Sequence, residues 1–77
     1  MSMLGNSRYF TRREGFADDT AYVVVGPRMH VVRYPRNRYP QESTLTPQFV
    51  ERAVARYGWV EITREEAERL RRRAEWL

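Results

Sequence analysis

The segment Ala21–Tyr34, AYVVVGPRMHVVRY, decides the fold class of this chain. Residues 21–25 are mostly β-branched or aromatic and predict a strand. The turn residues of Gly26–Arg28 follow, and residues 29–34 return with a similar composition, which predicts a second strand. Two strands joined by so short a turn form an antiparallel hairpin, so we expect an antiparallel sheet.

The sequence on either side of this hairpin adds one strand and then ends the sheet. Arg8–Thr11 predicts a short first strand, and the turn-forming residues within 15–20 predict a loop after it. Pro35 and Pro40 each lack a backbone N–H and hold the preceding tyrosine extended, so we expect them to stop the hydrogen-bonded ladder. We expect the loop to continue through residues 41–44.

A first helix is predicted after this loop. Thr46 is its expected N-cap, Pro47 suits the first helical position, and Gly58 is the expected stop. The apolar stripe predicted for this helix consists of Phe49, Val50, Ala53, Val54 and Tyr57.

A short strand and a second helix complete the chain. Trp59–Ile62 predicts the strand, and Thr63 with Glu66 forms a capping box that starts a helix over Arg64–Leu77. The stretch 59–67 is similar to strand–turn–helix segments of small bacterial and bacteriophage proteins, a resemblance that implies no particular activity.

These elements predict an α+β fold: a small antiparallel sheet of three to four strands, with two helices in the C-terminal half. At 77 residues we expect one domain, residues 1–77, in which residues 1–7 form a flexible tail. A domain this small has a limited core, although five Tyr, three Phe and two Trp can supply part of it. A second copy could bury the rest, so we expect a homo-oligomer.

The net charge of +4 comes entirely from arginine, because the chain has 14 arginines and no lysine. Selection for guanidinium groups, which form paired hydrogen bonds to phosphate or carboxylate, would give this composition. A GC-rich coding sequence would give it as well, so the absence of lysine has two explanations. Seven arginines meet three acidic residues within residues 8–38, and this excess favours an anionic partner.

Residue types that enzymes use are scarce in this chain. There is no cysteine and one histidine, His30, and the sequence holds no glycine-rich phosphate loop or hydrolase motif. We therefore expect a protein that is not an enzyme and that binds no metal and no cofactor. No segment resembles a signal peptide and no apolar run could span a bilayer, so we expect no membrane partner and a cytoplasmic location.

The best candidate for a binding site is the segment 28–39, where arginines alternate with aromatic and polar side chains. Guanidinium groups fit phosphate oxygens, and flat rings give nucleobases a surface for stacking. Strand alternation places Arg33 and Tyr34 on opposite faces, so one ligand is not expected to use both. In the alternative interpretation the tyrosines cover the core, and the arginines are solvated or paired with Glu42, Asp18 or Asp19. The expected ligand-binding residues are Arg28, His30, Arg33, Tyr34, Arg36, Arg38 and Tyr39.

The last helix is a second candidate, because arginines cluster at positions 69 and 71–73. A basic helix can contact nucleic acid or an acidic protein surface. The helix also carries Glu65–Arg69 and Glu68–Arg72 at i,i+4 spacing, which is typical of a solvated helix with a structural role.

Two functions remain open at this point. The first is a non-catalytic module that binds a phosphate-bearing ligand, either a nucleic acid or a nucleotide. The alternative is a protein-interaction module, for example a phage-derived regulator or inhibitor that docks on a larger protein, because Tyr, Trp and Arg dominate protein interfaces.

Overall fold

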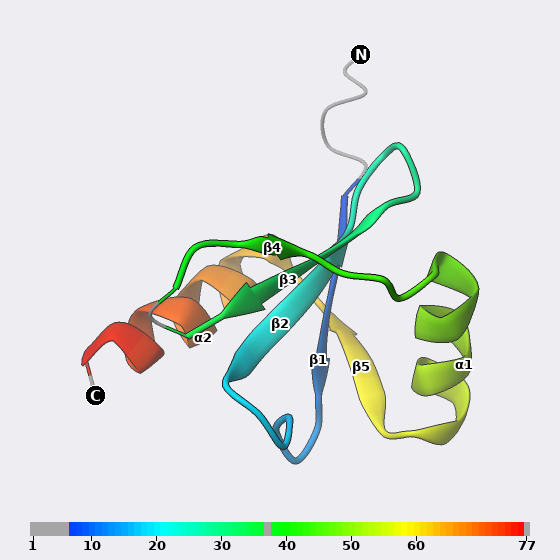
Figure 1. Cartoon of the computed structure of the whole chain (residues 1–77). Coiled ribbons are helices and arrows are strands. Elements are labelled where there is room, and N and C mark those ends of the chain that lie inside the picture. The colour runs from blue at the N-terminus through cyan, green and yellow to red at the C-terminus, as the bar shows by residue number, and fades with distance from the viewer. Residues whose placement is uncertain (1–6, 37, 77) are drawn as a thin grey trace.

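The computed structural model describes residues 7–36 and 38–76, with side-chain environments up to residue 72. The expected α+β fold is confirmed, since an antiparallel sheet carries two helices (Figure 1). The flexible tail expected at residues 1–7 lies, apart from Ser7, outside the described residues. The elements in chain order are β1 (Arg8–Arg12), β2 (Thr20–Val25), β3 (Val31–Pro35), β4 (Gln41–Glu42), α1 (Pro47–Arg56), β5 (Trp59–Ile62) and α2 (Arg64–Trp76).

The sheet has the strand order β4-β3-β2-β1-β5, and every neighbouring pair is antiparallel. The central strand is β2, whose six residues are all buried. Its register sets Val23 opposite Phe10 of β1, and Tyr22 opposite Tyr34 of β3. A strand buried along both faces needs cover on both sides, and the two helices supply it.

The sheet has five strands rather than three to four, because residues expected to be loop form β4. Gln41 and Glu42 pair with Arg33 and Val32 of β3. Pro40 removes a donor only at its own position, so the two residues after it keep their N–H groups and can join the ladder. The N–H of Ser43 continues the contact by donating to the carbonyl of Val31 at 2.9 Å.

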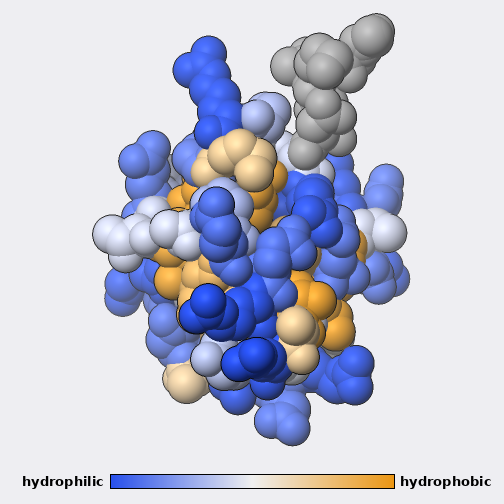
Figure 2. Space-filling model, turned by 90° about the vertical axis from the view of Figure 1, so that its right-hand side faces the viewer, coloured by the Kyte–Doolittle hydropathy of each residue, from blue (hydrophilic) through white to orange (hydrophobic). Residues whose placement is uncertain are grey.

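One face of the sheet is covered by α1 (Figure 1). The buried stripe of this helix is narrower than predicted, because Val54 is 39% and Tyr57 50% exposed. Each residue turns about 100° around a helix, so the position after Ala53 already points away from the sheet. Hydrophilic side chains cover most of this side of the molecule, and apolar atoms show between them (Figure 2). The core here consists of Phe10, Val23, Val25, Val31, Val50, Ala53 and Trp59, with Phe16, Leu45 and Phe49 packed against it.

The other face is covered by α2, which inserts a small side chain, Ala67, with no exposed surface. The small contact residue lets the helix approach the sheet closely. The core on this face consists of Ala21, Tyr22, Val24 and Ala67, with Tyr9, Tyr34 and Ile62 packed against it.

None of the helices among the described residues is long or apolar enough to cross a membrane.

Both predicted helix starts are confirmed. The Thr46 hydroxyl accepts a hydrogen bond from the N–H of Phe49 at 3.1 Å, and Pro47 occupies the first turn of α1. Thr63 and Glu66 form the reciprocal capping box of α2, with N–H to side-chain distances of 3.0 and 3.1 Å. Each pair satisfies backbone donors that a helix start would otherwise leave free.

The β2–β3 hairpin turns through a three-residue loop. The N–H of Met29 donates to the carbonyl of Gly26, and the N–H of Gly26 donates to the carbonyl of His30, both at 2.9 Å. Met29 has φ of 63°, so β3 begins at Val31 and not at the expected Met29. A turn followed by one left-handed residue is a common three-residue hairpin loop, in which glycine is favoured at the last position.

Replacing Met29 with glycine is expected to raise the free energy of unfolding by about 0.5–1 kcal/mol. Glycine removes roughly 1–2 kcal/mol of left-handed strain, and its larger unfolded-state entropy offsets part of that gain. The substitution removes little packing, because Met29 is 62% exposed. Urea denaturation measures the change, and Arg28→Gly is the control in the same exposed loop, where a glycine is expected to destabilise. Equal destabilisation by both variants would contradict the expected strain at Met29.

Candidate functional site

Three tyrosines line one face of the sheet on neighbouring strands: Tyr9 of β1, Tyr22 of β2 and Tyr34 of β3. The rings of Tyr22 and Tyr34 are stacked, with centroids 4.8 Å apart and 12° between their planes. Tyr9 is tilted against Tyr22 at 6.2 Å. The register of β1, β2 and β3 produces this row, because side chains on the same face recur at every second residue.

Arginines of α2 lie over this row of rings. The guanidinium carbon of Arg71 lies 5.3 Å from the centre of the Tyr34 ring, a cation–π contact. Ala67 fixes the height of the helix above the sheet, and Arg71 follows it by one helical turn on the same side. The row of rings and the arginines above it therefore form one site.

Between α2 and the sheet lies a pocket of about 390 Å³, here called the Tyr–Arg pocket. Arg64 pairs with Glu68 at 3.3 Å, so the positive excess of the pocket rests on Arg71 and Arg72. This pair replaces the expected Glu65–Arg69 and Glu68–Arg72 pairs, which do not form among the described side chains. The pocket is lined by Tyr9, Tyr22, Tyr34, Arg64, Glu68, Arg71 and Arg72.

Burial raises the pKa of Tyr22, and hydrogen bonding and charge from Arg71 oppose part of that rise. The phenol therefore stays neutral around pH 7, where it can donate a hydrogen bond. Tyr22 therefore adds no charge to the Tyr–Arg pocket at that pH. Among the described residues, no group of three His, Cys, Asp or Glu side chains could hold a metal ion.

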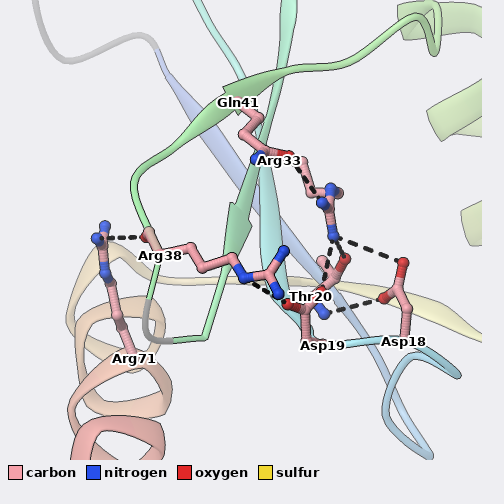
Figure 3. Close-up of polar contacts among 7 residues, drawn as sticks. All are labelled: Asp18, Asp19, Thr20, Arg33, Arg38, Gln41 and Arg71. Carbon is pink, nitrogen blue, oxygen red and sulfur yellow. Dashed lines mark hydrogen bonds and ion pairs between the residues drawn. The ribbon is translucent and has the colours of Figure 1, made fainter.

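Arg71 also ties α2 to the loop between β3 and β4. Its Nη2 donates to the backbone carbonyl of Arg38 at 3.2 Å (Figure 3). This contact places the backbone of Arg38 beside the helix. The N–H of the nearby Arg36 donates to the carbonyl of Asp19 at 2.7 Å, so Arg36 lies beside the start of β2. The Arg38 side chain is 66% exposed and reaches Asp19 with 3.6 Å between Nε and Oδ2. The segment singled out in the sequence and the basic helix thus meet at the Arg38 carbonyl, while the Arg38 guanidinium shares Asp19 with Arg33.

Arg33 lies on the opposite face of β3 and is held by acceptors of the protein itself (Figure 3). Its Nη1 donates to Asp19 Oδ1 at 3.1 Å and to Thr20 Oγ1 at 2.8 Å, and its Nη2 donates to Gln41 Oε1 at 2.8 Å. Hydrogen bonding to Thr20, more than the charge of Arg33, lowers the pKa of Asp18. Arg33 therefore joins β3 to β4 and to the start of β2.

Arg28 and His30 lie at the exposed tip of the β2–β3 hairpin, at the other end of β3 from Arg38. The His30 ring lies against Gly26, where an added Cβ would come within 2.7 Å of Cε1. Of the seven expected ligand-binding residues, Tyr34 lines the Tyr–Arg pocket and Arg38 meets α2 through its backbone carbonyl. Arg36 and the side chain of Arg38 lie beside Asp19, and Tyr39 is exposed next to Arg38 in the chain. The structure does not bring Arg28, His30 or Arg33 to the Tyr–Arg pocket.

Arg71 and Arg72 of this site belong to the last helix, the second candidate in the sequence. The site also contains residues that neither candidate included: Tyr9, Tyr22 and Arg64. A tyrosine appears in each of the three predicted N-terminal strands, and this recurrence is the signal that points to a shared row of rings. The face each ring occupies depends on register, which the sequence alone does not fix.

Comparison with protein-family models, with curated proteins and with solved structures gives no match to this chain. The chemistry of the Tyr–Arg pocket and the loop beside it is therefore the basis for a functional assignment.

Proposed function

We propose that this protein is a non-catalytic module that binds a phosphate-bearing ligand, a nucleic acid or a nucleotide, at the Tyr–Arg pocket and the adjoining β3–β4 loop. The observation that carries the proposal is the position of Arg71, which contacts both Tyr34 and the carbonyl of Arg38. Through it, two elements that carry arginines, α2 and the β3–β4 loop, lie side by side, which supports a shared anionic ligand. We expect this module to act in the cytoplasm.

The arginines are suited to phosphate because their planar guanidinium groups donate paired hydrogen bonds and stay charged at any physiological pH. Arg36, Arg38 and Arg72 are exposed, so their charge is available to a ligand from solution. The ion pair of Arg38 with Asp19 opposes phosphate binding only weakly, because exposed ion pairs contribute only about 0–1 kcal/mol to stability. A phosphate can therefore displace the carboxylate.

The double variant Arg38→Ala/Arg72→Ala is expected to weaken binding of a labelled single strand of about 12 nucleotides by roughly tenfold per arginine. The slope of log affinity against log salt should also become shallower by about 0.7 for each phosphate that the variant no longer neutralises. Fluorescence anisotropy over a range of salt concentrations measures both quantities.

The matched control is Arg52→Ala/Arg56→Ala, which removes the same charge from exposed positions on α1. The control should retain affinity and most of the salt slope. Equal reductions in the two double variants would mean that the ligand responds to net charge and not to this site.

The alternative function is a protein-interaction module, such as a phage-derived regulator docking on a larger protein. The observation in its favour is the exposure of large aromatic side chains, Tyr39 and Tyr57, because tyrosine and arginine dominate binding hot spots. A partner captured equally well after nuclease treatment and at moderate salt would favour this alternative. The expected homo-oligomer stays a prediction.

A further inference from the structure

Tyr39 differs from the other tyrosines of the site by its exposure. Its side chain is 87% exposed, whereas Tyr22 is buried and stacks on Tyr34. Arg71 covers the Tyr34 ring from the helix side. The rings inside the Tyr–Arg pocket are thus engaged with each other and with Arg71, and Tyr39 offers a ring surface to solvent.

The backbone around Tyr39 restricts the position of this ring. Pro40 disfavours helical conformations for the residue before it and holds Tyr39 extended. The preceding residue, Arg38, is attached to α2 through its carbonyl. A backbone restricted in this way loses little freedom on binding, which favours the use of this segment as a contact surface.

We propose that the ligand of this site is a single-stranded nucleic acid, with one base stacked on Tyr39 and successive phosphates on Arg36, Arg38 and Arg72. This inference rests on the proposed function and names its ligand class. A basic surface combined with an exposed aromatic ring is the arrangement by which proteins bind single strands without reading their sequence.

A duplex is disfavoured because both faces of each internal base are already stacked on neighbouring bases. Stacking on Tyr39 would require a base to leave the duplex. The free energy of unpairing and unstacking that base opposes binding, whereas the bases of a single strand are already unpaired. A mononucleotide is disfavoured for a different reason. The exposed arginines come from two separate elements, the β3–β4 loop and α2, and a chain of phosphates can reach more of them at once than one nucleotide can.

The test compares three labelled probes of the same base composition: a single strand of about 12 nucleotides, the corresponding duplex, and a mononucleotide. We expect the single strand to bind most tightly. Tyr39→Ala should weaken its binding roughly 5- to 150-fold, the range found for removal of one stacking contact. Tyr39→Phe should bind nearly as the parent does, because the ring is retained.

Two controls make the result specific. Tyr57→Ala removes another exposed tyrosine, at the end of α1, and should leave binding unchanged. The salt slope should be the same for Tyr39→Ala and the parent, because the tyrosine carries no charge. Circular dichroism checks that each variant is folded.

The possible outcomes separate this inference from the proposed function. If the duplex or the mononucleotide binds as well as the single strand, or if Tyr39→Ala has no effect, the single-strand inference is wrong and the phosphate-binding proposal stands. If none of the three probes binds, both are wrong. Tight single-strand binding that depends on the Tyr39 ring would support both.

Discussion

Replacing Trp59 with alanine is expected to lower the free energy of unfolding by about 3–5 kcal/mol, the usual cost of truncating a buried large aromatic side chain. Trp59 is the first residue of β5 and is 9% exposed. Its ring meets Phe16 edge-on at 5.0 Å and Phe49 at 5.9 Å. It therefore joins the β1–β2 loop, α1 and the sheet edge through one side chain.

The expected loss is a large fraction of the total free energy of unfolding, because a domain of this size is stabilised by roughly 4–12 kcal/mol. Urea denaturation followed by circular dichroism measures it. Trp59→Phe should recover part of the loss because the edge-on packing can be retained. Tyr57→Ala, a half-exposed aromatic two residues earlier, should cost less than about 1 kcal/mol. A loss below that value for Trp59→Ala would contradict the packing of this cluster.

The helix starts could be predicted from the sequence because their chemistry is local. The hydroxyl of Thr46 and the capping box of Thr63 with Glu66 act within four residues of chain, so no knowledge of the fold is needed. Gly58 belongs to the same class, since it has φ of 77° just after α1.

Strand faces could not be predicted in the same way. Residues 23–25 are three valines, and the two helices cover both faces of β2, so no alternation between apolar and polar residues marks an outer face. The short strand β4 was missed for a related reason. Its two residues are exposed and polar, and only their pairing with Val32 and Arg33 makes them a strand.

The candidate site depends on contacts between distant segments. Arg71 meets Tyr34 and the carbonyl of Arg38 across more than thirty residues of chain, and the path of α2 over the sheet decides this meeting. The acceptors of Arg33 are likewise set by the approach of Asp19 and Gln41 to β3. Composition predicted an Arg- and Tyr-rich surface, and the tertiary arrangement determined which of its members lie together.

Ala67 packs between α2 and the sheet and does not line the Tyr–Arg pocket. A larger side chain at this position is therefore expected to move α2 away from the sheet while every residue that lines the pocket is kept. Replacing Ala67 with leucine adds three carbons at a position with no exposed surface, against Tyr22 and Val24. Overpacking of this kind costs about 1–3 kcal/mol, and for a domain of this length each kcal/mol lowers the Tm by roughly 4–8 °C. We therefore expect a fall in Tm between about 4 and 24 °C.

The same substitution is expected to weaken binding well below the Tm, because a raised helix carries Arg71 away from Tyr34 and from the carbonyl of Arg38. Ala55→Leu is the matched control: it makes the same change at an exposed position of α1 and should alter neither Tm nor affinity appreciably. Thermal unfolding and anisotropy with the single-stranded probe are measured on both variants. If Ala67→Leu lowers the Tm and leaves affinity unchanged, the placement of α2 stabilises the fold but does not build the binding site. A reduction of both, against an unchanged control, would show that the residue that holds the helix on the sheet also positions the arginines for the ligand.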